Sequence, residues 1–63
     1  MFHEYDMVKL LKNIPEEQLT AGAMGVIQIV HDVPGLPIAY VVEFTNDMNE
    51  VVILTLLEKE IEL

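Results

Sequence analysis

Two short clusters combine histidine with carboxylates, the side chains from which a Zn²⁺ or Fe²⁺ site is built. The first cluster is His3, Glu4 and Asp6, and the second is His31 with Asp32. Neither has the spacing of a strong metal motif, and on a strand His3 and Asp6 would point to opposite faces. We therefore expect solvated residues at strand ends and no metal site. The Asp6 carboxylate is expected to accept hydrogen bonds from backbone amides in a turn.

Carboxylates also stand close together at Glu16-Glu17 and at Glu58, Glu60 and Glu62, so paired acid–base catalysis has to be considered. Such catalysis requires one carboxyl group in an apolar pocket, where burial raises its pKa. A chain of 63 residues has a small, filled interior with little room for such a pocket. It also contains no serine or cysteine that would serve as a nucleophile. We expect solvated acids, no catalytic residue, no cofactor and no enzymatic activity.

Gly22 and Gly25 stand three residues apart, a spacing that also occurs in loops that bind phosphate. A phosphate loop requires a following helix and a lysine, and the sequence predicts neither here. The structural interpretation is a tight turn and a close chain crossing.

Acidic residues dominate the charge of the chain. Eleven of them stand against three lysines, and the net charge is -8. Without arginine there is no guanidinium group to contact bases or phosphates, and the negative charge repels nucleic acids and anionic membranes. We therefore expect no nucleic-acid partner and no membrane contact. No apolar run reaches the ~18 residues of a membrane span. The acidic N-terminal residues do not resemble a signal peptide, so a cytoplasmic protein is expected.

Alternating or β-branched runs predict four strands and a short fifth one. They occupy residues 2–11, 25–31, 38–45 and 51–56, with residues 61–63 as an edge strand. A short helix is the alternative for the first segment, because Val8, Leu11 and Lys12 also fit one helical face. In the second segment, Ile27 and Ile29 are expected to share one face.

The connections are predicted from proline, glycine and polar residues. Residues 13–22 form a long loop, in which Pro15 starts a short helical turn and Gly22 supplies a positive φ. Ile14 and Leu19 are expected to hold this loop against the core. Residues 32–37 predict a turn, and the polar residues 46–50 predict a hairpin.

Strands at hairpin spacing in so short a chain favour a small barrel, because two flat sheets would need more residues. We therefore predict an all-β, SH3-like, partly open five-stranded antiparallel barrel, with one long loop carrying a short helical turn. Residues 1–63 form one such domain. In the third strand Tyr40, Val42 and Phe44 alternate with more polar neighbours, so Phe44 is expected in the core.

Apolar residues make up 52% of the chain, more than so small a core accommodates. Methionine adapts to varied surfaces and is common at binding sites. Met7, Met24, Val26 and Val41 are therefore a candidate protein-binding patch on the outer side of the sheet. Gap filling or loop capping is the alternative role for the methionines, including Met48.

Four motifs follow one another along the chain: an opening Asp-x-Val-x-Leu strand, an Ile-Pro-Glu-Glu loop followed by glycines, a Tyr-x-Val-Glu-Phe strand and a final Leu-Thr-Leu. They lie at Asp6–Leu10, at Ile14–Glu17 with Leu19, Gly22 and Gly25, then at Tyr40–Phe44 and Leu54–Leu56. In these motifs the sequence resembles the bacterial domain-of-unknown-function family 4926, which is common in cyanobacteria. The chain departs from the family pattern at Ala23-Met24 and at Val26, where polar residues are usual. Both departures make the outer surface more apolar.

The resemblance implies a small SH3-like barrel without established catalytic activity, similar to accessory or antitoxin-like proteins. Together with the acidity and the apolar surplus, it favours a protein-interaction module whose partner is another small protein with a basic surface. The alternative is a structural protein that associates with itself as a homodimer or higher oligomer.

Overall fold

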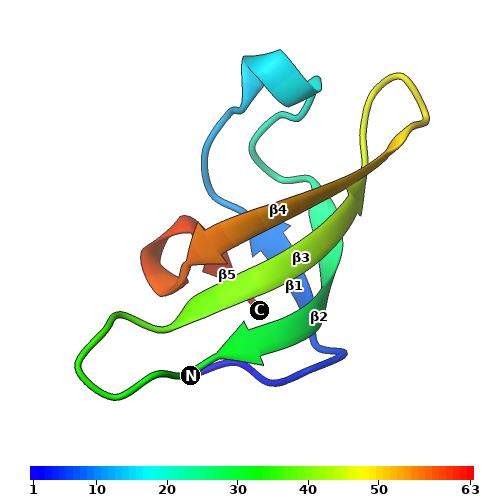
Figure 1. Cartoon of the computed structure of the whole chain (residues 1–63). Helices are drawn as coiled ribbons and strands as arrows, with labels where there is room; N and C mark the ends of the chain where they lie inside the picture. Colours follow the sequence, from blue (N-terminus) through cyan, green and yellow to red (C-terminus); the bar gives the residue numbers. More distant parts are fainter.

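The computed structural model describes residues 1–63, and its five strands form one antiparallel sheet in the order β4-β3-β2-β1-β5. The strands are β1 (Met7–Leu10), β2 (Met24–His31), β3 (Ala39–Thr45), β4 (Val51–Leu57) and β5 (Ile61–Glu62). Figure 1 shows the sheet curling until β1 and β5 lie behind β3 and β4. The curl stops short of closure, because β4 and β5 do not pair. The predicted all-β, partly open SH3-like barrel is confirmed.

The helical elements are two 3-10 turns, η1 (Pro15–Glu17) and η2 (Glu58–Glu60). The first is the turn predicted in the long loop, and the second connects β4 to β5. No helix of the structure is long and apolar enough to cross a membrane.

The core consists of nine buried apolar side chains that point to the inner side of the curled sheet. They are Val8, Leu10, Leu19, Ile27, Tyr40, Val42, Phe44, Leu56 and Ile61. Phe44 is 1% exposed, so its predicted core position is confirmed. Leu19 and the partly buried Ile14 pair through an isolated bridge and hold the long loop on this core, as expected.

The two glycines of the loop before β2 have separate structural roles. Gly22 has φ of 99°, a conformation that closes the loop and that side chains rarely allow. Gly25 lies in β2 opposite Phe44, and a Cβ atom there would come within 2.7 Å of the Phe44 ring. The ring therefore packs directly on the backbone of β2, which is the close approach that the spacing predicted.

A β-bulge in β2 overturns the prediction that Ile27 and Ile29 share one face. Ile27 pairs with Val42, but Ile29 pairs with Val41, so the register shifts by one residue between them. The shift turns Ile29 to the outer side, where it is 46% exposed, while Ile27 is fully buried. Val30 takes the core-facing position instead and packs against the core cluster.

The first strand is shorter than predicted, because residues 2–6 form a turn and no strand. Tyr5 has φ of 69°, which no extended strand allows. The Asp6 carboxylate accepts the backbone N–H of His3 at 2.9 Å, the turn contact expected for Asp6. The turn also brings the His3 Nδ1 atom to 3.9 Å from Asp6, so the prediction of opposite directions was wrong.

The N-terminus is fastened to the core through Tyr40. The Tyr40 hydroxyl accepts the Phe2 N–H at 3.1 Å and donates to the Glu58 carboxylate at 2.7 Å. The Phe2 and Tyr40 rings also contact each other, with centroids 5.3 Å apart. Burial raises the pKa of the Tyr40 hydroxyl above its ordinary value of 10.0, and the bond to Glu58 acts in the same direction.

Candidate protein-binding surface

The outer side of the sheet carries a second set of apolar side chains, on the same strands that build the core. Cross-strand partners share a face, and the pairing links Met7 to Val26, Ile29 to Val41 and Thr45 to Val51. Glu43 pairs with both Val26 and Ile53, which joins these pairs into one surface. We call its seven apolar residues the outer apolar face: Met7, Met24, Val26, Ile29, Val41, Val51 and Ile53.

The outer apolar face is open to solvent. Met7 and Met24 are 57% and 47% exposed, and Val51 and Ile53 are 64% and 61% exposed. Val26 and Val41 are half-buried by their neighbours in the sheet. Apolar side chains of β1, β2 and β3 pair directly, whereas Val51 and Ile53 of β4 pair with the polar Thr45 and Glu43 of β3.

All four residues predicted for the patch, Met7, Met24, Val26 and Val41, lie on the outer apolar face. Met48 lies elsewhere, exposed in the hairpin between β3 and β4.

Sequence reasoning missed Ile29, Val51 and Ile53. The bulge conceals Ile29 in the sequence, because strict alternation predicts it on the same face as Ile27. The sequence does indicate Val51 and Ile53, since β4 is an apolar run in which every second residue has to face outward.

Few charges interrupt the outer apolar face. The two charged residues whose pairing places them within it are Lys9, opposite Met24, and Glu43, between Val26 and Ile53. The Lys9 amine lies 4.0 Å from a carboxylate oxygen of Glu62 in the neighbouring strand. The surface is therefore mainly apolar: Glu43 lies between apolar neighbours, and Lys9 lies between Met24 and its ion-pair partner Glu62.

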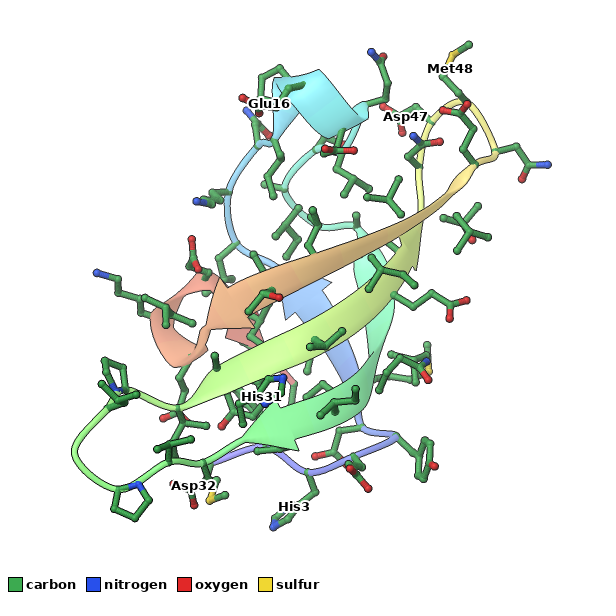
Figure 2. The ribbon with its side chains drawn as sticks, in the orientation of Figure 1. His3, Glu16, His31, Asp32, Asp47 and Met48 are labelled. Carbon is green, nitrogen blue, oxygen red and sulfur yellow. The ribbon has the colours of Figure 1, made fainter.

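Carboxylates gather at one end of the molecule, where η1 meets the β3–β4 hairpin. The buried Asn46 joins these segments: its Nδ2 atom donates to the Glu17 carbonyl at 2.8 Å, and its Oδ1 atom accepts two hairpin amides. The Asp47 N–H adds a bond to the Gln18 carbonyl at 3.1 Å. Figure 2 shows Glu16 and Asp47 together at this end. We call the four carboxylates gathered here the acidic end: Glu16, Glu17, Asp47 and Glu50.

None of the ion pairs in the structure reaches the acidic end. Lys9 pairs with Glu62, and the Lys12 amine lies 2.6 Å from the Glu60 carboxylate. The Glu60 carboxylate also accepts the Leu57 N–H at 2.7 Å. This hydrogen bond, and then the contact with Lys12, lower the pKa of Glu60 below its ordinary value of 4.5. Two of the three lysines thus pair with acids beside β5, and no lysine forms an ion pair with the acidic end.

The histidine clusters do not form a metal-binding geometry, since no three His, Asp or Glu side chains converge. His3, His31 and Asp32 lie at the end of the molecule opposite the acidic end (Figure 2). Glu16-Glu17 and Glu58–Glu62 belong to separate regions, the first to the acidic end and the second to η2 and β5.

The fold and this surface define a small SH3-like barrel with an apolar outer sheet and an acidic end. The chain belongs to the family described as Domain of unknown function (DUF4926), which matches residues 4–63. The predicted family is thereby confirmed. No curated protein and no solved structure matches the chain.

Proposed function

We propose that this protein is a protein-interaction module, an accessory or antitoxin-like partner of another small bacterial protein in the cytoplasm. The outer apolar face is its docking surface. The observation that carries this proposal is the gathering of seven apolar side chains on the outer side of four strands, with five of them close to half exposed or more. Covering such side chains removes apolar area from water at about 25 cal/mol per Å².

The charge of the chain indicates a partner with a basic surface. At a net charge of -8, long-range attraction accelerates encounter with a cationic protein and opposes encounter with acidic ones. The acidic end supplies four carboxylates without a lysine partner, next to Val51 at the border of the outer apolar face. Association with such a partner is therefore expected to weaken as salt rises.

The test is capture of a partner from the native host at low salt, with three versions of the protein as bait. The wild type is compared with Met24→Glu, which places a charge in the outer apolar face. The matched control is Leu36→Glu, at an exposed position in the β2–β3 loop. A stoichiometric partner retained by wild type and Leu36→Glu, but lost by Met24→Glu, supports the proposal. Recovery of no stoichiometric partner, or equal recovery by all three, contradicts it.

Self-association is the second candidate function, because the outer apolar face is also able to cover a copy of itself. Its charge opposes this role, since a dimer doubles the net charge of -8. Light scattering at tens of micromolar protein separates the two candidates. A monomer rules out self-association, whereas a dimer that Met24→Glu dissociates and Leu36→Glu does not would favour it over a foreign partner.

A further inference from the structure

β4 leaves one edge of the sheet open. It is the terminal strand and pairs with β3 alone. Its seven residues, Val51–Leu57, include no charged residue, proline or glycine. Proteins ordinarily protect a long edge strand with a lysine, a proline, a bulge or a covering loop. The opposite edge follows this rule, because β5 is two residues long and one of them is Glu62.

The hairpin determines which backbone groups of β4 are free. The Asn46 N–H donates to the Glu50 carbonyl at 2.9 Å, which makes these two residues a hydrogen-bonded pair. Bonded and non-bonded pairs alternate along an antiparallel ladder, so the register makes Phe44–Val52 and Val42–Leu54 bonded pairs. The residues of β4 that alternate with these direct their N–H and C=O groups to the open edge: Val51, Ile53 and Thr55. The free donors end at Leu57, whose N–H donates to Glu60.

Open depressions of different chemistry lie at the two ends of β4. The one at its start, about 360 Å³, is lined by Val51 and Val52 together with Glu16, Glu17 and Glu50 of the acidic end. The one at its finish, about 350 Å³, is lined by Pro37, Ile38 and Leu57 together with Glu58 and Lys59. An added strand would therefore meet charges of one sign, the carboxylates, at one end, and at the other end apolar side chains with charges of both signs.

We infer that β4 accepts an antiparallel strand from the basic partner, a deepening of the proposed function on which this inference rests. An antiparallel strand begins beside Leu57 and ends beside Val51. It carries an apolar residue at its start, β-branched residues along its length, and lysine or arginine just after its end. Main-chain hydrogen bonds to Val51, Ile53 and Thr55 hold it, and the acidic end selects its basic residues.

A second copy of β4 fits this edge less well. When two copies of β4 pair antiparallel along all seven residues, the two-fold axis passes through Leu54. Glu50 of each copy then lies directly opposite Glu58 of the other copy, so the like-charge contact occurs twice. Like charges directly opposite in a ladder are destabilising. The acidic end instead favours a strand that carries positive charge just after the position beside Val51.

The test uses a synthetic peptide, acetyl-Leu-Thr-Val-Thr-Val-Thr-Val-Lys-Lys-amide, titrated into the full chain and followed by amide NMR shifts. Slowed exchange and shifts at Val51, Ile53 and Thr55 are expected. The reversed sequence, and a version with glutamine in place of both lysines, are each expected to bind about tenfold more weakly, a loss of about 1.4 kcal/mol. A peptide N-methylated at alternate residues loses the edge hydrogen bonds and is expected not to bind.

Two protein variants check the site itself. Thr55→Pro removes a donor that points to the open edge and leaves the β3–β4 ladder intact, so binding is expected to disappear. Thr55→Val keeps the donor and is its matched control. If Thr55→Pro fails to fold, Ile53→Lys serves instead, because a lysine on the edge strand opposes pairing and repels the cationic peptide.

Three results would overturn the inference. The first is absence of peptide binding to the wild type. The second is a set of shifts confined to Met7, Met24 and Val26, which places the peptide on the outer apolar face. The third is a dimer joined through β4 before peptide is added. In the first two cases the proposed function is still tested separately, by partner capture with the wild type and the Met24→Glu variant.

Discussion

The inner and outer sides of the sheet are built from the same strands and from the same kinds of residue. Ile27 is fully buried and Ile29 is 46% exposed, although both are isoleucines two positions apart in β2. In β3, the buried Val42 and the half-buried Val41 are direct neighbours. The comparison teaches that register decides whether an apolar side chain stabilises the fold or remains available for binding. We expect substitutions on the two sides to affect different measurements.

The largest effect is expected from Phe44→Ala on the inner side. Removing a buried phenylalanine costs about 3–5 kcal/mol, comparable with the whole stability of so small a domain. Thermal denaturation should show an unfolded or nearly unfolded protein at room temperature. The matched control is Thr45→Ala, the exposed neighbour in β3. A midpoint lowered by only a degree or two in Phe44→Ala would show that the two sides do not differ as described.

The isoleucine pair in β2 gives the most direct comparison of the two sides. Ile27→Ala empties a core position and is expected to cost about 2–5 kcal/mol. Ile29→Ala, the same chemical change on the outer side, should alter the free energy of unfolding by less than about 1 kcal/mol. Urea denaturation of both variants measures the difference. Equal losses would contradict the bulge, because they would place both side chains in the core.

The contact between Gly25 and Phe44 tests how tightly the inner side is packed. In Gly25→Ala the new methyl group would lie 2.7 Å from the Phe44 ring, closer than atoms normally approach. Such overpacking typically costs about 1–3 kcal/mol. The cost should shrink in a Phe44→Leu background, where the ring is absent, and a double-mutant cycle measures this coupling. Strictly additive effects would mean that the ring does not pack on this glycine.

The smallest effect is expected at the end of β4, where the Glu60 carboxylate accepts the N–H of Leu57, the last residue of that strand. Its folded pKa is depressed, so its carboxylate adds stability above the ordinary value of 4.5. That stability is lost as the pH falls through the depressed value in the folded state. Glu60→Gln should lower the free energy of unfolding by about 1 kcal/mol at pH 7. It should also flatten the decline of stability below pH 4.5.

Lys12→Gln is the control for this last prediction, because it removes the ion pair and keeps the hydrogen bond from Leu57. It should have the smaller effect, since the backbone hydrogen bond is the larger cause of the pKa shift. Urea denaturation between pH 3 and pH 7 distinguishes the two variants. A larger effect of Lys12→Gln would reverse the order of the two causes.

Much of the fold was predictable because local residue chemistry and the fold agree. Pro15 starts the 3-10 turn, Gly22 has the positive φ, and the alternation of Tyr40, Val42 and Phe44 correctly predicts the inner side of β3. The errors arose where a nonlocal contact prevailed. In residues 2–6, the nonlocal hydrogen bond from the Tyr5 N–H to the Ile27 carbonyl, together with the local one from the His3 N–H to the Asp6 carboxylate, stabilises a turn in place of a strand.

The candidate surface was predictable only in part for the same reason. The apolar surplus and the adaptability of methionine predict the patch of Met7, Met24, Val26 and Val41. The sequence predicts Ile29 on the face of Ile27, because a bulge depends on how β2 pairs with β3 and leaves no mark in the alternation of β2 itself.

The sequence by itself determined the acidity, the strand content, the loop chemistry and the family, because each depends on residue type and local conformational preference. Tertiary structure alone decided where the chemistry-bearing groups meet. The Asn46 side chain joins η1 to the hairpin and so gathers carboxylates more than twenty-five residues apart in the chain. The unpaired β4 is likewise a property of the sheet order, because a strand is an edge only in relation to its neighbours.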